Sequence, residues 1–144
     1  MHLKNPHYRE DIQRIFDTAG HVQALGIQLT DAGPGWCETH LDVTPRHLQQ
    51  TDVVHAGVLA TLADHTAGAA GSTLMAADEY ALTVEFKINL LRAARTDRLW
   101  CRSQVLKPGR MITVAESEVF AASGAATKLV AKATVTLAVL KRET

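Results

Sequence analysis

An acidic and a basic side chain, Asp64 and His65, lie next to each other in an otherwise small and apolar segment, VVHAGVLATLADHTAGAA (53–70). The composition of this segment predicts a long buried helix. A carboxylate in such a helix is costly to desolvate unless it is paired, hydrogen-bonded or protonated. Asp64 could therefore belong to a structural hydrogen-bond network, or it could be a carboxylate with a raised pKa that acts as general base or nucleophile.

Small residues surround Asp64 on the predicted helix. The positions three, four and seven residues away share its face, and they are Gly57, Ala60, Thr61, Ala67, Gly68 and Gly71. The bulkier residues fall mainly elsewhere and suit the concave side of a sheet: Val58, Leu59, Leu62 and Leu74. Glycines lower helix propensity by about 1 kcal/mol each, but they let another backbone or a thin ligand come close. Asp64 is therefore expected to face a tight cleft or a subunit interface.

The start of the helix adds a second group that could do chemistry. His55-Ala56-Gly57 stands where a loop leads into the helix, so the first backbone N–H groups have no intrahelical acceptor. With the helix dipole behind them, they could hold an anion or a developing oxyanion. Such a donor together with a carboxylate about two turns along the helix favours acyl transfer or hydrolysis.

The two histidines near Asp64 favour structural roles. His55 is more readily interpreted as a residue that holds its loop through backbone hydrogen bonds than as a catalytic group. His65 points about 100° away from Asp64 on the helix, so packing or a hydrogen bond to the sheet is the better reading. A metal site built from His55, Asp64 and His65 has no recognised ligand spacing. We expect no metal and no cofactor.

The remaining elements are predicted from periodicity. Asn5-Pro6 starts a short amphipathic helix that runs to about Ala19 and is stopped by Gly20. Strands are expected over residues 26–30 and 36–43, with a turn in AGPGW (32–36) between them. Further strands are expected over residues 83–91, 98–106, 111–121 and 128–140. In the first of these four strands, Val84, Phe86, Ile88 and Leu90 are placed on one face.

The order of the elements predicts an α+β fold. Turns at residues 107–110 and 122–126 make the last three strands an antiparallel meander. A helix that is apolar nearly all round must be covered on every side. One curled sheet covers one side of this helix, so another segment or another molecule must cover its remaining face.

Composition excludes several classes of protein. The chain has 144 residues, expected to form one domain over 1–144, with 15 basic and 15 acidic side chains. This balance gives no reason to expect nucleic acid or an anionic membrane as a partner. The N-terminal segment lacks the apolar core of a signal peptide, and Asp64 and His65 interrupt the longest weakly polar run, residues 56–77. We therefore expect a cytoplasmic protein, in which Cys37 and Cys101 are reduced thiols.

The segment LQQTDVVHAGVLATLADHTAGAA (48–70) resembles the signature of the hotdog-fold acyl-CoA thioesterases, in particular the phenylacetyl-CoA type. That signature has Asn or Gln, then His-Gly-Gly six residues later, then Asp nine residues after the His. Gln49, His55-Ala56-Gly57 and Asp64 stand at these spacings. LTVEFKINLLRAA (82–94) is similar to the strand that follows in the family, and the resemblance covers roughly residues 26–140.

The resemblance implies a hotdog fold: a curled antiparallel β-sheet wrapped around one long central helix, here with a short N-terminal helix. It also implies a homodimer or homotetramer with active sites at the dimer interface and an acyl-CoA substrate. By position, Asp64 would be the nucleophile or general base, and Gln49 of the facing subunit would bind the thioester or position water. The N–H of Gly57 or Ala56 would polarise the thioester carbonyl, and Thr83 would help to hold the water.

The sequence departs from the family pattern at three positions. Ala56 replaces the first glycine of the usual pair, so a methyl group crowds the carbonyl site although the N–H remains. Leu90 and Ala93 replace the usual aromatic and proline around Leu91-Arg92.

Four further residues are assigned to substrate binding. His55 lies in the loop at the expected site, and Arg92, Lys107 and Arg110 lie in or near turns, where they could bind the phosphates of coenzyme A. Each of the three basic side chains could equally be an ordinary solvated charge.

Three functions compete at this stage. An acyl-CoA thioesterase is the leading hypothesis. The alternative is a non-catalytic acyl-CoA-binding or regulatory hotdog protein, which would have no need for both Gln49 and a carboxylate at the scissile bond. A dehydratase or hydratase would require a catalytic histidine with a partner acid in a different loop context, and neither His55 nor His65 is placed that way.

Overall fold

The computed structural model describes residues 2–143. Its helices are α1 (Tyr8–Thr18), α2 (Gly20–Leu25) and α3 (Ala56–Ser72), with a 3₁₀ turn, η1, at Pro45–His47. Its strands are β1 (Gln28–Gly33), β2 (Trp36–Asp42), β3 (Glu79–Leu90), β4 (Arg98–Lys107), β5 (Ile112–Ser123) and β6 (Ala126–Lys141). None of the helices in residues 2–143 has the length and apolar character needed to cross a bilayer.

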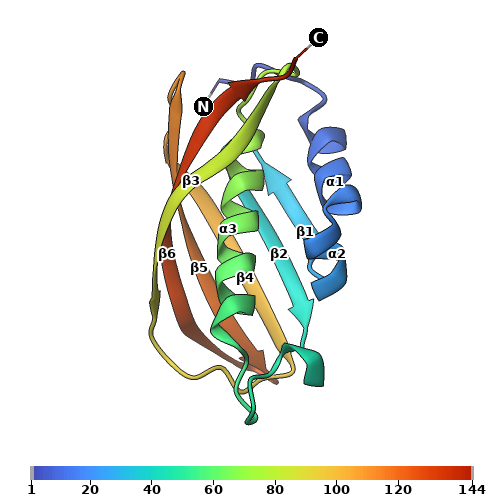
Figure 1. Ribbon diagram of the computed structural model, residues 1–144, viewed down its shortest axis with the longest axis vertical. Helices are drawn as coiled ribbons and strands as arrows, with labels where there is room; N and C mark the ends of the chain where they lie inside the picture. Colours follow the sequence, from blue (N-terminus) through green and yellow to red (C-terminus); the bar gives the residue numbers. More distant parts are fainter. Residues whose placement is uncertain (1, 144) are drawn as a thin grey trace.

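One antiparallel sheet curls around α3, as the resemblance implied (Figure 1). The strand order is β1-β2-β4-β5-β6-β3, and every pairing is antiparallel. Strands β4, β5 and β6 form the predicted meander. Strand β3 lies at one end of the sheet, where β6 is its only strand partner among the described residues. The hotdog architecture is thus confirmed.

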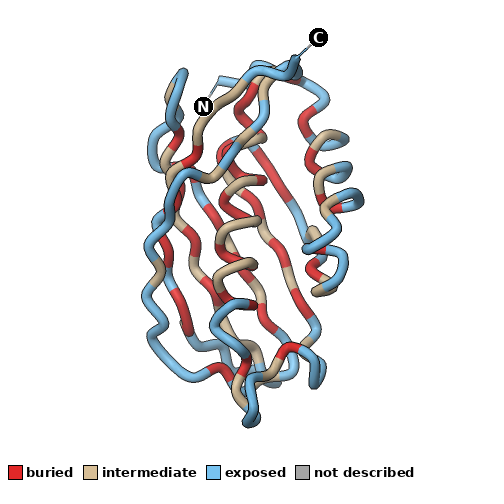
Figure 2. The backbone as a smooth tube through the Cα atoms, viewed as in Figure 1, coloured by how far each residue is buried: buried red, intermediate tan, exposed pale blue. Residues whose placement is uncertain are grey.

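Helix α3 fills the concave side of the sheet, and Figure 2 shows buried residues along both. The predicted core residues of the segment are buried: Val58, Leu59, Leu62 and Leu74. Buried polar side chains on this face pair with one another or with the helix backbone. The hydroxyls of Thr39 and Thr66 are 2.7 Å apart, and Ser117 donates to the carbonyl of Ala63 at 2.7 Å. These hydrogen bonds fix the rotation of α3 against the sheet.

The N-terminal region contains a helix that the sequence prediction missed. The prediction that Asn5 caps this helix with Pro6 as its first residue is wrong, because the helix begins at Tyr8 and His7 is its N-cap. Oδ1 of Asn5 accepts the N–H of His7 at 2.9 Å in the turn just before the helix. Gly20 was predicted only to stop this helix, but α2 starts there after an extended residue at Ala19. The predicted strand at residues 26–30 is wrong at its start. Gly26 has φ of 82° and ends α2 in the left-handed conformation that glycine allows.

The turn between β1 and β2 is shorter than predicted. β1 continues to Gly33, so only Pro34 and Gly35 lie outside the strands. Proline followed by a glycine with φ of 81° is typical of a type II turn.

Strand β3 contains a bulge that corrects the predicted face. Thr83 pairs with Leu137 and Glu85 with Thr136, so Val84 is an extra residue. Phe86 pairs with Val135, which is buried like Leu137. Thr83 therefore lies on the helix-facing side together with Phe86, Ile88 and Leu90, and Val84 does not belong to this set. The shift matters because it turns the Thr83 hydroxyl towards α3.

Candidate active site

Asp64 on α3 and Thr83 on β3 form a hydrogen-bonded pair. The Thr83 hydroxyl donates to Oδ1 of Asp64 at 2.7 Å, and Asp64 is half-buried. Within residues 2–143, no lysine, arginine or histidine forms an ion pair with Asp64. A structural network would be expected to satisfy both oxygens of a buried carboxylate. The one hydrogen bond instead orients Asp64 and leaves Oδ2 available.

The predicted stripe of small residues divides into two parts. Ala67 and Gly71 are buried, and a Cβ built on Gly71 would lie 2.6 Å from Cδ1 of Leu137, so a larger residue there would require Leu137 of β6 to shift. In contrast, a Cβ built on Gly68 would meet no atom within 4 Å. Gly57, Ala60 and Thr61 are also not buried. The face around Asp64 is therefore open at its small residues.

A cavity of about 330 Å³ begins at Asp64 and Thr83. Its walls come from the second half of α3, the start of β3 and the inner face of α1, all of which lie close together in Figure 1. Ligand pockets in proteins usually range from about 300 to 1,000 Å³. The cavity is thus large enough for a small organic group, and much of a coenzyme A molecule would have to remain outside.

The start of α3 presents one backbone donor. His55 is the N-cap, and its Nδ1 accepts the N–H of Gly57 at 2.8 Å. This confirms the predicted structural role of His55. The same bond engages the Gly57 N–H, whereas the N–H of Ala56 has no acceptor among residues 2–143. Of the two predicted oxyanion donors, Ala56 is the one that is available.

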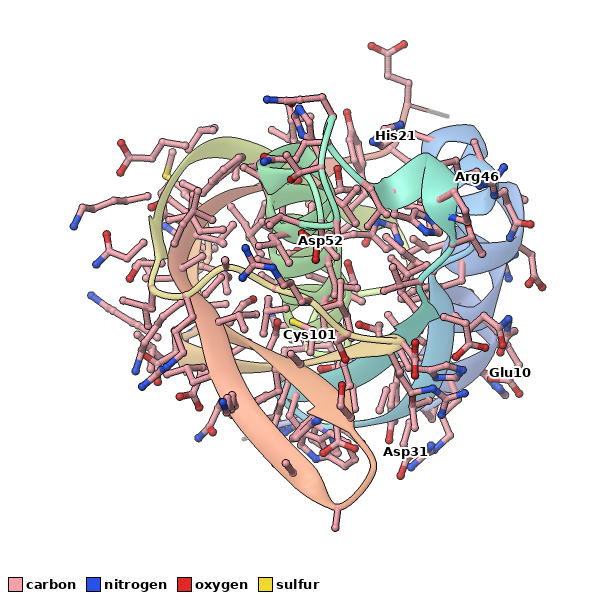
Figure 3. The ribbon with its side chains drawn as sticks, turned by 90° about the horizontal axis from the view of Figure 1, so that it is seen from below. Glu10, His21, Asp31, Arg46, Asp52 and Cys101 are labelled. Atoms are coloured by element: carbon pink, nitrogen blue, oxygen red, sulfur yellow. The ribbon has the colours of Figure 1, made fainter. Side chains whose placement is uncertain are left out.

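Gln49 lies beside this helix start. It lines a small pocket of about 260 Å³ together with Ala56, Leu90 and Arg92. Its side-chain amide donates to the hydroxyl of Thr51 at 3.1 Å. Figure 3 views the molecule from this end, with Asp52 of the loop before α3 labelled. Gln49 and Ala56 therefore lie together at one end of α3.

This helix start and Asp64 are too far apart to act together within one chain. Eight residues separate Ala56 from Asp64, which corresponds to about 12 Å along a helix. A reacting carbonyl must lie about 3 Å from both its oxyanion donor and its attacking group. Within one chain, the Ala56 N–H and the Asp64 carboxylate thus lie at separate places on the same helix.

The basic side chains predicted to bind phosphate are not all together. Arg92 lies at the Gln49 end of the molecule. Arg110 lines a pocket with Gly71 near the other end of α3. Lys107 is the last residue of β4 and leads into the turn that contains Arg110. A single chain therefore does not bring Arg92 to the other two.

His65 packs inside the protein rather than joining Asp64. Its ring meets Phe16 of α1 edge to face, with centroids 4.6 Å apart. Burial lowers the pKa of His65, and its Nε2 has no hydrogen-bond partner among residues 2–143. The predicted packing role is confirmed, and the alternative hydrogen bond to the sheet is not observed there.

The cysteines are not candidate nucleophiles. Cys37 and Cys101, the latter labelled in Figure 3, are both free and buried. Burial raises the pKa of both thiols, that of Cys101 to about 11, so neither forms a thiolate readily. In residues 2–143 no group of three or more histidine, cysteine or acidic side chains is placed to hold a metal ion.

Comparison with known proteins identifies the family. A sequence model of the Thioesterase superfamily matches residues 51–128. A thioesterase family protein of Silicibacter pomeroyi has a similar structure, with a TM-score of 0.91 and 32% identity over 93% of this chain and 98% of that one. A thioesterase of Haemophilus influenzae gives a TM-score of 0.85 at 26% identity, over 98% of this chain and 96% of that one. The PaaI protein of Escherichia coli, from the phenylacetic acid degradation operon, shares the fold with a TM-score of 0.84 at 20% identity, over 96% of this chain and 97% of that one. The match covers more than half of the chain, which therefore belongs to the thioesterase superfamily of thioester hydrolases.

Proposed function

We propose that this protein hydrolyses acyl-CoA thioesters at sites shared between two chains. Asp64 and Thr83 come from one chain, and the Ala56 N–H and Gln49 come from the other. The separation of Ala56 and Asp64 on one helix supports this arrangement most directly, because neither half can complete a reaction centre with its own counterpart.

A two-fold axis near Ala60 would bring the halves together. Ala60 is midway between Ala56 and Asp64, so two antiparallel α3 helices related there place each Ala56 beside the other chain's Asp64. Ala60 and Thr61 are small and partly open, which lets two helices approach closely. The same contact would cover the face of α3 that the sheet leaves bare.

The free edge of the sheet supports the same pairing. Strand β3 exposes apolar side chains there: Leu82, Val84 and Phe86 are 53%, 56% and 43% exposed. An apolar edge strand with unpaired backbone groups is a template for another strand. Pairing of two β3 strands across the axis would join the sheets of a homodimer, which could pair again into a tetramer.

Each group then has a role in hydrolysis. The Ala56 N–H binds the thioester oxygen, which becomes negatively charged as the carbonyl carbon is attacked. Asp64 either removes a proton from the attacking water or attacks the carbon itself, and Thr83 and Gln49 hold the reacting groups in place. The C–S bond breaks, the sulfur leaves as a thiolate that takes up a proton, and the acid is released.

Release of free thiol from acyl-CoAs tests this function. The panel should contain short, medium, long and aryl acyl groups, because the phenylacetyl-CoA type of the signature makes aryl acids one candidate class. Turnover of any member supports the proposal. Tight binding of acyl-CoA without turnover would favour the alternative, a non-catalytic acyl-CoA-binding protein.

The Ala56→Pro variant tests the oxyanion donor. Proline at the first helical position replaces the N–H hydrogen with a ring carbon and keeps the helical backbone, and His55 already has the extended backbone that a residue before proline prefers. We expect kcat to fall about 10²-fold, as when an oxyanion donor is lost, with little change in thermal stability. If kcat is unchanged, Ala56 is not the donor. Gly20→Pro, at the first position of α2 after the extended residue Ala19, is the matched control.

The Thr83→Val variant tests the partner of Asp64. Valine keeps the shape of threonine and removes the hydroxyl that donates to Asp64. A hydrogen bond to a charged group contributes about 1.5–3 kcal/mol, so we expect kcat to fall about tenfold or more while KM changes little. Thr136→Val, at a threonine that donates weakly to Glu85 on the other face of the sheet, is the control. Equal losses in both variants would argue against a role for Thr83.

A further inference from the structure

The cavity beside Asp64 changes character along its length. From Asp64 it follows α3 for about 12 Å to Ser72. Ile15, Ala69 and Leu137 contribute apolar groups to its wall. Six polar or charged residues from outside α3 also line it: Asn5, Asp11, Glu79, Tyr80, Thr83 and Arg142. Glu79 begins β3, four residues before Thr83, and Arg142 is hydrogen-bonded to Asp78, so both lie away from the Asp64 end.

Asp11 and Glu79, the two acids of the cavity wall outside α3, already have partners. Asp11 accepts a hydrogen bond from the amide of Asn5 at 2.8 Å and pairs with Arg14 at 2.9 Å. The carboxylate of Glu79 accepts the N–H of Ala76 at 2.9 Å and lies 4.0 Å from the ammonium group of Lys4. Neither acid needs a cationic ligand to balance it.

Arg142 is exposed, and within residues 2–143 it is the cationic side chain of the cavity wall that has no counter-ion. Its guanidinium stacks over Tyr80, 5.6 Å from the ring centroid, and forms no ion pair within residues 2–143. Its backbone N–H donates to the carbonyl of Asp78 at 2.7 Å, which anchors the residue at the start of β3. The adjacent Lys141, in contrast, is paired with Asp78 at 3.1 Å.

The charge around Arg142 favours an anionic ligand. Arg14, Lys4 and Lys141 are each paired with a carboxylate, namely Asp11, Glu79 and Asp78. Among the described residues of the cavity wall, the two charges without an ion-pair partner are therefore Asp64 at the reacting end and Arg142. A guanidinium binds a carboxylate through two parallel hydrogen bonds, which gives direction as well as attraction.

We infer that the cavity selects ω-carboxyacyl thioesters, the half-thioesters of dicarboxylic acids. The thioester lies at Asp64, the methylene chain passes Ile15 and Leu137, and the distal carboxylate binds the guanidinium of Arg142. This inference relies on the proposed function for the reactive end. The limited volume fits an acyl chain of this kind and leaves coenzyme A outside.

Matched substrates test the inference. Adipyl-CoA and hexanoyl-CoA differ by the distal carboxylate, as do succinyl-CoA and butyryl-CoA. We expect the wild type to prefer adipyl-CoA to hexanoyl-CoA in kcat/KM. Arg142→Gln should lower kcat/KM for adipyl-CoA about tenfold, the size expected for one charge-assisted pair, and leave hexanoyl-CoA unchanged. Arg142→Lys should recover part of the loss, and Lys128→Gln, which removes an exposed positive charge at the far end of β6, is the control with no effect on the ratio.

Two outcomes would overturn the inference: no preference for the carboxylated substrate in the wild type, or equal losses for both substrates in Arg142→Gln. Calorimetric measurement of adipate and hexanoate binding distinguishes a failure of the carboxylate site from a failure of the proposed function. If no thioester is hydrolysed but adipate binds through Arg142, the function fails and the carboxylate site stands. If hexanoyl-CoA is hydrolysed through Asp64 and Arg142 does not affect adipyl-CoA or adipate, the function stands and the carboxylate site fails.

Discussion

Asp64→Asn is expected to lower kcat for acyl-CoA hydrolysis about 10³-fold, because it removes the carboxylate that accepts a proton from water or attacks the carbonyl. Asparagine has nearly the same shape, and its amide oxygen still accepts the hydrogen bond from Thr83. Substrate binding and folding should therefore be preserved. The measurement is thiol release under saturating substrate, with KM and thermal unfolding determined on the same samples.

A matched carboxylate serves as the control for this prediction. Asp17 lies on the exposed side of α1 and accepts a hydrogen bond from Gln13. Asp17→Asn removes the same charge from the protein without touching the cavity, and kcat should not change. If Asp64→Asn retains full activity, Asp64 is structural and the proposed chemistry is wrong. If both variants lose activity, net charge rather than the site is responsible.

The residues on α3 could be predicted from the sequence because they depend on local spacing. Helical periodicity alone places Asp64 among small residues and sends Leu62 and its neighbours to the sheet. The meander of the last three strands likewise follows from alternation and turns. The capping role of His55 follows from its place before a helix. These predictions hold because each depends on residues within a few turns of one another.

The structural features that the sequence did not predict depend on contacts between segments that are distant in the chain. The bulge at Val84 arises from the pairing of β3 with β6, and no alternation within β3 reveals it. The wall that α1 contributes to the cavity depends on Ile15 reaching α3 across the fold. Arg142 is far in sequence from every signature residue, so nothing local pointed to it. Tertiary packing decides these features, and periodicity does not report tertiary packing.

Mixing two inactive variants should restore activity if the site is shared between chains. Asp64→Asn and Ala56→Pro damage opposite halves, so a mixed dimer holds one site with both defects and one site with none. Random assembly makes about half of the dimers mixed, with one of two sites intact, so we expect about a quarter of the wild-type rate. The variants should be unfolded and refolded together, or co-expressed with different tags, before thiol release is measured.

A second mixture distinguishes shared sites from sites within one chain. Wild type refolded with the double variant Ala56→Pro/Asp64→Asn gives mixed dimers in which every shared site carries one defect. If the sites are shared, only the dimers of two wild-type chains are active, and about a quarter of the rate of the same amount of pure wild type should remain. If each site lies within one chain, every wild-type chain is active, and about half of that rate should remain. Recovery in the first mixture together with a quarter in the second would place the reaction between the two α3 helices. No recovery in the first mixture and half in the second would contradict the shared site and require each chain to bring Ala56 and Asp64 together by itself, against the length of the helix between them.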